Sequence, residues 1–463
     1  SLRFDGDSYQ SRDPSETGIT IKGNFSAWVK FATSNTEVAL FGGFDSSGAN
    51  DNDGYMVFKR TADGNLQFEG GDNVYLETTA LFRDTSAWYH IVLAIDSSNA
   101  TANNKQRIYV NGAEITAFDT RNNLTNLQDL PMNSTAGNDD RFLVGCDEDT
   151  GGRGLFFTGY MADVYWIDNN SQMAASDFGE YNDNGVWIPK DGSDISFGDK
   201  NSFKMEYGSS GNLGLDSSGL GNSLGDNAGL AATNQTTDTP TNNFCTMNPL
   251  DVGSDLRDNG SFAEGNLEVT NGATSGQADQ QRVRGTIAVT KGKWYFEMKQ
   301  IANSASIGVL ATEAAHGGTS ANSMLVEYND GGEIRFFNGS GRTTKTTGID
   351  SFDDDDIVGC ALDMDNRRAY FHKNGAYQGD PTPDPAGSPS GAGQFGGIQT
   401  GFTMAPCMFD NSSGSAGKGS FNFGNAPFAI SSGNSDGAGF GNFEYAVPSG
   451  YFSLCTKNLA TYG

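Results

Sequence analysis

Two loops carry carboxylates that could hold a metal ion. Asp45, Asp51 and Asp53 lie in one loop, and Asp147 and Asp149 lie in another, just before the strand expected to close the first half of the chain. Hard oxygen ligands of this kind suit Ca²⁺. Their spacing is not that of an EF-hand, so a shared site requires the two loops to meet. These five residues are the candidate calcium ligands, and the sequence suggests no other cofactor.

Paired carboxylates could also hydrolyse a glycosidic bond. A retaining glycosidase needs two of them about 5–5.5 Å apart on one face, and a strand supplies such a pair at alternate positions. The acid pairs at positions 69 and 72, 180 and 183, and 327 and 330 fall at turn-like sites instead. Solvated acids are the simpler interpretation. The sequence therefore predicts no catalytic residue and a protein that is not an enzyme.

Other patterns for nucleophiles and metals fail on context. Gly433-Asn-Ser-Asp-Gly437 matches a nucleophile elbow, but that motif needs a later histidine and the last one is His372. The three histidines are too scattered for a His-x-x-x-His ligand pair. Five cysteines include no Cys-x-x-Cys pair, so we expect buried thiols and not a zinc site.

The charge of the chain excludes several partners. Its 463 residues include 29 Lys and Arg against 57 Asp and Glu, which gives a formal net charge of −28. Such a charge repels phosphate backbones and anionic membrane surfaces. The apolar run from Ile91 to Ile95 is far shorter than the ~20 residues that cross a bilayer. We expect no nucleic acid partner and no membrane insertion.

The elements that would position these side chains are strands. In the segment Phe25 to Phe31, apolar residues alternate with others, which predicts a strand with one buried face. Asn111-Gly112 and Asn374-Gly375 each join two such runs and predict tight hairpins, because both central residues of a type I′ turn need positive φ. The best helical segment is short, from Ser171 to Tyr181.

The pattern predicts an all-β chain of two antiparallel β-sandwich domains. Residues 1–190 form the first domain and residues 251–463 the second. Residues 191–250, rich in Gly, Ser, Asn and Thr, form a linker or extended strap between them. Residues 379–397 are expected to form a long surface loop. A strand, an Asp-containing turn and a strand ending in Asn-Gly occur in both halves, which suggests related architectures.

A sugar-binding sandwich would also need an exposed aromatic side chain. Trp28, Trp88, Trp166 and Trp187 are candidates by residue type alone, and core positions are the more common use of tryptophan. The ligand-binding residues stay unidentified at this point.

Longer runs in the sequence resemble known families. The start Ser-Leu-Arg-Phe-Asp, the run Trp88-Tyr-His-Ile-Val and the closing Phe157-Thr-Gly-Tyr-Met-Ala-Asp-Val-Tyr resemble laminin-G-like, concanavalin A-like jelly rolls. Gly292-Lys-Trp-Tyr-Phe-Glu, the segment Asp356 to Asp365 and Tyr370-Phe-His-Lys-Asn-Gly look like a SPRY domain. The first resemblance implies loops that can bind calcium at one rim, and the second implies peptide binding through loops.

The order of the two domains is similar to that of bacteriophage virion proteins of the tail-fibre or head-decoration type. The resemblance implies a non-enzymatic particle protein that assembles in the host cytoplasm with copies of itself and other virion proteins, and that contacts a host-surface glycan or protein. Two alternatives remain open, namely a secreted glycan-binding protein or polysaccharide-active enzyme, and a cellular adhesin or protein-interaction module.

Overall fold

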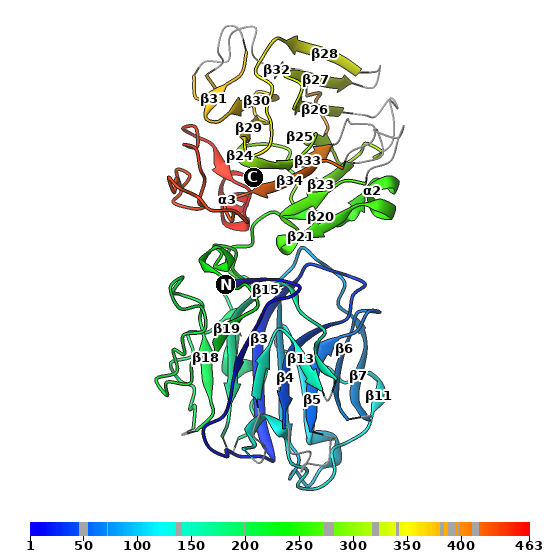
Figure 1. The fold of residues 1–463 in the computed structure, drawn as a ribbon, viewed down its shortest axis with the longest axis vertical. Coiled ribbons are helices and arrows are strands. Elements are labelled where there is room, and N and C mark those ends of the chain that lie inside the picture. Colours follow the sequence, from blue (N-terminus) through cyan, green and yellow to red (C-terminus); the bar gives the residue numbers. More distant parts are fainter. Residues whose placement is uncertain are drawn as a thin grey trace. The chain divides into compact units, whose positions relative to one another are not determined.

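The structure, a computed structural model, describes residues 1–45, 54–71, 73–135, 141–149, 151–169, 171–198, 200–272, 282–316, 324–338, 342–379, 384–387, 395–396, 398–409 and 416–463. The chain divides into two compact units, Ser1–Thr241 and Asn242–Gly463. Figure 1 draws the first from blue to green and the second from green to red. Residues 191–241, predicted to lie in a linker or strap, belong to the first unit.

The first unit is a sandwich of two antiparallel sheets. Its front sheet, as named here, has the order β1 (Leu2–Asp5), β15 (Thr158–Ile167), β3 (Lys22–Phe31), β8 (Tyr89–Asp96), β9 (Gln106–Val110) and β10 (Ala113–Glu114), and β18 (Phe203–Met205) also pairs with β15. Its back sheet has the order β11 (Phe118–Arg121), β7 (Asn73–Leu81), β6 (Asn65–Gly70), β5 (Tyr55–Arg60), β4 (Val38–Phe44), β12 (Arg141–Val144), β2 (Tyr9–Arg12) and β19 (Gly225–Asn227).

Two small hairpins and a short α-helix also belong to the first unit, with three 3-10 turns at Ala102–Asn104, Pro131–Asn133 and Ala232–Asn234. The hairpins are β13 (Asp147–Asp149) with β14 (Gly152–Gly154), and β16 (Gly179–Tyr181) with β17 (Trp187–Pro189). The helix α1 spans only Ala175–Phe178, so the longer helix predicted from Ser171 to Tyr181 is wrong beyond that turn. Gly179 begins β16, and its extended backbone ends the helix.

The predicted alternation in β3 is confirmed. Phe25, Val29 and Phe31 are fully buried in the core between the two sheets. The Phe25 ring stacks on Phe41 of β4 with ring centroids 4.9 Å apart. The alternate residues of β3 face outward, yet Ser26, Trp28 and Lys30 are also buried. A second layer must therefore cover the outer face of the front sheet.

The covering layer is the chain that follows β15, and we call residues 171–241 the strap. Its residues Ala175 and Phe178 pack on Val92 and Tyr165 of the front sheet. The strap ends in a buried ion pair, because Lys30 Nζ lies 2.9 Å from Asp238 Oδ2, with side chains 1% and 0% exposed. Trp88 Nε1 donates to Asp238 Oδ1 at 2.9 Å. The polar composition of the strap thus supplies partners to buried groups.

The second unit is also a two-sheet sandwich. One sheet has the order β21 (Ser261–Ala263), β22 (Glu268–Thr270), β34 (Lys418–Asn422), β24 (Lys293–Ala302), β29 (Ile357–Asp363), β30 (Arg368–Lys373) and β31 (Ala376–Tyr377), with β32 (Phe395–Gly396) on β30 and β35 (Phe452–Ser453) on β24. The other has the order β20 (Met247–Val252), β23 (Arg282–Gly285), β33 (Met404–Phe409), β25 (Ser306–Ala311), β26 (Met324–Asn329), β27 (Glu333–Asn338) and β28 (Arg342–Thr347). The helices α2 (Ser254–Asn259) and α3 (Thr456–Tyr462) are short.

The two units share one topology, as the recurring strand pattern suggested. Strands β1–β10, β12 and β15 match β22–β31, β33 and β34 in chain order and in their neighbours within each sheet. An ion pair recurs at the matching place, since Lys22 begins β3 and pairs with Asp96 at 3.2 Å, while Lys293 begins β24 and pairs with Asp363 at 3.0 Å. Both Asn-Gly hairpins are confirmed, with positive φ at Asn111 and Asn374 and at the glycine that follows each.

Two histidines are buried, His90 on β8 and His372 on β30. His90 Nδ1 accepts from Trp187 Nε1 at 3.0 Å, so the ring hydrogen sits on Nε2, which lies 2.9 Å from Ser26 Oγ. His372 Nδ1 accepts from Gly375 N, and its Nε2 lies 2.7 Å from the Tyr295 hydroxyl. Burial lowers the pKa of both histidines to about 3. Each ring is neutral and serves as a structural hydrogen-bonding partner.

Two further expectations concern a surface loop and the cysteines. The surface loop predicted at residues 379–397 lies largely outside the described residues. All five cysteines are buried, as expected. Among the described residues, no helix is long and apolar enough to span a bilayer.

Breaking the buried ion pair should destabilise the first unit strongly. In Asp238→Asn, the Lys30 ammonium keeps its burial and loses its counter-charge, which costs about 3–5 kcal/mol. The matched control is Glu16→Gln, which breaks the exposed Lys200–Glu16 pair, 3.1 Å apart with side chains 36% and 57% exposed, and should cost under about 1 kcal/mol. Urea unfolding followed by tryptophan fluorescence measures both. Equal losses in the two variants would contradict the role given to Asp238.

The neutral His90 ring should make the first unit sensitive to acid. Because its pKa in the folded state lies below the ordinary value of 6.5, the unfolded chain binds the extra proton first, and stability falls as the pH drops from about 6.5 towards 3. Between pH 7 and pH 4 the loss is about 3 kcal/mol. The variant His90→Gln, unfolded in urea at both pH values, should lose distinctly less on acidification than the unchanged chain. An identical loss would rule out His90 as the titrating group.

Candidate functional site

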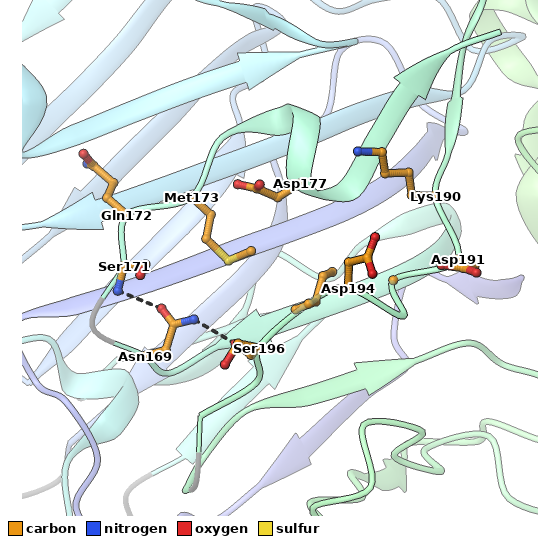
Figure 2. Close-up of a pocket in the computed structure, with 11 residues that line it drawn as sticks. Asn169, Ser171, Gln172, Met173, Asp177, Lys190, Asp191, Asp194 and Ser196 are labelled. Atoms are coloured by element: carbon orange, nitrogen blue, oxygen red, sulfur yellow. Dashed lines mark hydrogen bonds between the residues drawn. The ribbon is translucent and has the colours of Figure 1, made fainter.

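A polar pocket opens on the first unit, between α1 and the chain that follows β17 (Figure 2). Its volume is about 280 Å³. Most of its side chains are polar, and Met173 and Ile195 supply the apolar part. The lining residues are Asn169, Ser171, Gln172, Met173, Asp177, Lys190, Asp191, Gly192, Asp194, Ile195 and Ser196. All lie in the strap or just before it.

Asn169 fixes two walls of the pocket to each other. Its Oδ1 accepts from the backbone N–H of Ser171 at 2.9 Å, and its Nδ2 donates to the carbonyl of Ser196 at 2.9 Å, as Figure 2 shows. A single amide side chain thus joins the start of the strap to a segment 25 residues further on.

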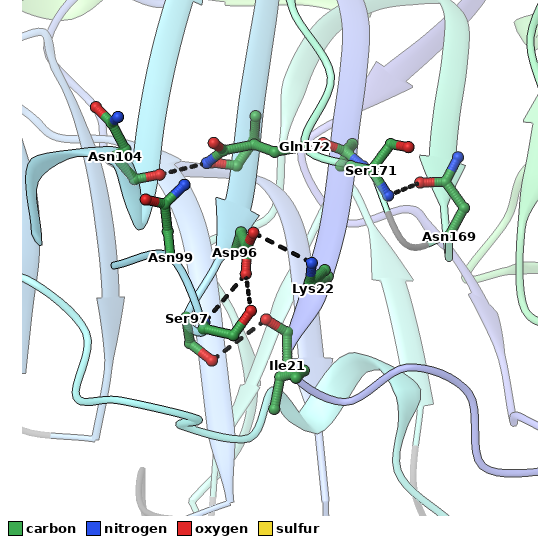
Figure 3. A network of polar contacts seen from close by, with 12 residues as sticks. Ile21, Lys22, Asp96, Ser97, Asn99, Asn104, Asn169, Ser171 and Gln172 are labelled. Carbon is green, nitrogen blue, oxygen red and sulfur yellow. Dashed lines mark hydrogen bonds and ion pairs between the residues drawn. The ribbon is translucent and has the colours of Figure 1, made fainter. Parts of the chain in front are cut away.

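The wall at Ser171–Met173 is anchored to the front sheet. Gln172 Nε2 donates to the carbonyls of Asn104 at 2.6 Å and Ala94 at 3.3 Å (Figure 3). Asn24 of β3 accepts from the Met173 N–H at 2.8 Å and donates to the Ser171 carbonyl at 2.9 Å. The nearby Lys22–Asp96 ion pair, also drawn in Figure 3, joins β3 to β8. This wall therefore has little freedom to move.

The opposite wall is fixed by charged side chains. Lys190 Nζ donates to the carbonyl of Ser176 at 2.6 Å, and Lys204 Nζ donates to that of Asp191 at 2.7 Å. Asp191 Oδ1 accepts from the N–H and the hydroxyl of Ser193, and these hydrogen bonds hold the pKa of Asp191 below its usual value. Gly192 has a φ of +75°, and a Cβ there would lie 2.8 Å from the Tyr165 hydroxyl, so glycine is required for this close approach.

The carboxylates leave the pocket rich in hydrogen-bond acceptors. Among the described residues, Asp177 accepts a hydrogen bond at Oδ2 alone, from the Ala174 N–H at 2.8 Å. Asp194 is exposed and has no hydrogen bond or ion pair with the described residues. Against Asp177, Asp191 and Asp194 stands one cation, Lys190. Such a lining suits a ligand with many hydroxyl donors and disfavours an anion.

The predicted calcium ligands are only partly described. Asp51 and Asp53 lie outside the described residues, and Asp45 is 2% exposed at the end of β4. Asp147 and Asp149 lie on β13, which packs on β4 and β5. The approach to β4 is close, because a Cβ placed on Gly42 would lie 3.6 Å from Asp147 Cα. Burial, and then the charge of Asp149, raise the pKa of Asp147 to about 6. Among the described residues, no group of three or more His, Cys, Asp or Glu is placed to hold a metal ion. Calcium binding stays a prediction.

Three of the four candidate tryptophans are buried, and the fourth is partly exposed. Trp28, Trp88 and Trp166 are at most 8% exposed and do not reach a ligand. Trp166 packs in the core and donates from Nε1 to Asn133 at 3.1 Å. Trp187 is half-buried in the β16–β17 hairpin, close to the pocket in sequence.

Comparisons with known proteins agree with the fold of the first unit. Residues 7–170 match the family described as the concanavalin A-like lectin/glucanases superfamily, so this part of the chain is similar to concanavalin A-like domains. No curated protein matches the chain.

Among solved structures, the chain is similar to three in particular. One is the SPRY domain of human HERC1, with 19% identity, a TM-score of 0.24, and coverage of 34% of this chain and 87% of that one. Another is the TRIM65 PSpry domain, with 10% identity, a TM-score of 0.27, and coverage of 38% and 91%. The third is stonustoxin, with 15% identity, a TM-score of 0.27, and coverage of 38% and 27%.

The pocket residues escaped prediction from the sequence. They follow residue 168, in a stretch whose Asn, Asp, Ser and Gly content is typical of a linker. The signals that could have found them are Trp187 and the Asn184-Gly185 turn, which predict a hairpin inside that polar stretch.

The raised pKa of Asp147 gives a direct test of the calcium prediction. In calcium-free buffer, carboxyl NMR should show Asp147 titrating near pH 6, and Asp149→Asn should lower that midpoint because it removes a neighbouring negative charge. If the site binds Ca²⁺, excess calcium lowers the midpoint further, since the cation favours the carboxylate. If the midpoint of the Asp147 titration is the same with and without excess calcium, Asp147 is excluded as a calcium ligand.

Proposed function

We propose that the first unit is a carbohydrate-binding module without catalytic activity, and that the pocket lined by Asp177, Lys190 and Asp194 holds a sugar. The observation that carries this proposal is the pocket itself, in which carboxylates and an ammonium group line the same hollow as the apolar side chains of Met173 and Ile195. A sugar ring presents hydroxyls at its rim and C–H groups on its faces, and it needs both kinds of contact.

The charges in the pocket favour a neutral glycan. The three carboxylates outnumber Lys190, so sialylated, sulfated or uronic acid units would be repelled. The whole chain adds to this effect through its net charge of −28. The walls are held by hydrogen bonds before any ligand arrives, which reduces the entropy lost on binding.

Binding is better supported than hydrolysis. A glycosidase needs one carboxyl group whose pKa is raised so that it can donate a proton. In the pocket, the hydrogen bonds from Ser193 lower the pKa of Asp191, which makes that carboxyl group a poorer proton donor. Asp191 is therefore suited to accept hydrogen bonds from a ligand and not to protonate a leaving group.

We also propose that the chain acts on a virus particle, as a fibre or decoration component that attaches to a host-surface glycan. The support is the sequence resemblance of the two-domain order to bacteriophage virion proteins, together with an acidic composition that favours solubility. Mass spectrometry of purified particles tests this location. If the protein is absent from the particles and present in the medium, the secreted alternative is favoured.

Removal of one charged acceptor from the pocket should weaken sugar binding without unfolding the chain. In Asp194→Asn, two charged acceptors become one neutral acceptor and a donor, and the affinity for a neutral glycan identified on a glycan array should fall about tenfold or more. The matched control Asp119→Asn changes an exposed acid on β11 and should bind as before. Calorimetric titration measures the affinity, and thermal unfolding verifies the fold. Unchanged binding by Asp194→Asn would refute the assignment of the pocket.

A further inference from the structure

The β16–β17 hairpin is a rigid projection of the strap. Gly179 pairs with Pro189, and Tyr181 pairs with Trp187. At the tip, Asn182 Oδ1 accepts from the N–H groups of Asn184 and Val186 at 3.0 and 2.9 Å, and the Asn182 carbonyl accepts from Gly185 N–H at 2.9 Å. These local bonds fix the shape of the turn.

Trp187 fastens this hairpin to the front sheet. Its Nε1 donates to His90 Nδ1 at 3.0 Å. Its ring lies over two glycines, since a Cβ at Gly112 would come within 2.7 Å of the indole and a Cβ at Gly179 within 2.6 Å. The hairpin is therefore held at a defined position on the sandwich.

The same hairpin leaves apolar surface in solvent. Tyr181 is 61% exposed and Val186 is 56% exposed. The Tyr181 ring meets Trp187 edge to face, with centroids 4.8 Å apart, which supports the ring from one side. Within the described part of the chain, its hydroxyl makes a single long contact, donating to the Asn111 carbonyl at 3.4 Å. The ring is therefore held from one side by Trp187 and is accessible to a ligand on its exposed side.

The hairpin and the pocket are continuous. Asp177 lies two residues before β16 and Lys190 directly after β17, and both line the pocket. The Lys190 N–H also bonds the Phe178 carbonyl at 3.0 Å, which closes the base of the hairpin. Three residues of extended chain, about 10 Å, separate Lys190 from the Trp187–Tyr181 pair. A short oligosaccharide covers that distance, whereas a monosaccharide in the pocket does not.

We propose that Tyr181, supported by Trp187, forms a second sugar subsite, and that the module recognises a neutral oligosaccharide running from the pocket along the hairpin. This inference rests on the proposed function of the pocket. The ring of Tyr181 stacks on the C–H face of a sugar unit, and Val186 extends the apolar contact. The exposed acids Glu180 and Asp183 beside it favour an uncharged glycan over an anionic partner. Because the hairpin is already rigid, little entropy is lost on contact.

Calorimetry with ladders of cello-, laminari-, malto- and chito-oligosaccharides, from one to six units, tests the proposal on the full chain. In the unchanged protein, affinity for the ladder that binds should rise with length until the chain reaches Tyr181 and then level off. Tyr181→Ala should remove that rise, about a tenfold loss for the long oligomers, and leave monosaccharide affinity unchanged. Tyr181→Phe keeps the ring and should retain the rise. Leu250→Ala, a substitution of a 54% exposed residue of the second unit, is the matched control.

Each outcome decides between the two claims. If the protein binds monosaccharides and its affinity does not rise with oligosaccharide length, the second subsite is refuted and the pocket assignment is retained. The same conclusion follows if the affinity rises with length and Tyr181→Ala does not remove that rise. Failure of every ladder to bind the unchanged chain would overturn the pocket and the subsite together. If Tyr181→Ala instead abolishes self-association seen by sedimentation and has no effect on sugar affinity, the hairpin is a contact between copies of the chain and the sugar subsite is excluded.

Discussion

The outer face of the front sheet carries large side chains that are buried away from water. The first unit depends on a layer of chain that covers them. Trp28, Trp88 and Tyr160 point away from the sandwich core yet are at most 8% exposed. Burial of apolar surface contributes about 25 cal/mol per Å², but the same face also holds the charge of Lys30. The strap meets both demands, because it packs Trp187 against these aromatic side chains and places Asp238 against the ammonium group.

The pocket is a consequence of that solution. A polar chain that crosses an apolar sheet must bond its backbone to side chains, and Asn24, Gln172 and Asn169 supply those bonds. Where the strap doubles back, its two walls stand apart and leave a hollow whose acids face solvent. The second unit covers its matching sheet in the same manner, since the buried Glu297 accepts from the backbone N–H groups of Glu444 and Tyr445. Two sandwiches of one topology thus use different residues for one task.

Local pattern was enough to predict the sandwiches from the sequence. Alternation in Phe25 to Phe31 and the Asn-Gly turns at 111 and 374 act over a few residues, so their outcome is readable from the chain alone. The strap and the pocket depend on pairs far apart, such as Lys30 with Asp238, 208 residues away, and Gln172 with Asn104. A segment rich in Gly, Ser and Asn looks like a linker until its partners are known. The predicted helix from Ser171 to Tyr181 failed for the same reason, because tertiary contacts of Met173 and Trp187 decide the local conformation.

We propose that the strap pocket of the first unit binds a neutral sugar. A crystal structure of the chain grown with its tightest-binding neutral oligosaccharide tests this most directly. We expect a sugar ring in the pocket, with its C–H face on Met173 and Ile195 and its hydroxyls bonded to Asp177 and Asp194. A sugar bound elsewhere on the chain, with this pocket holding only solvent, would contradict it.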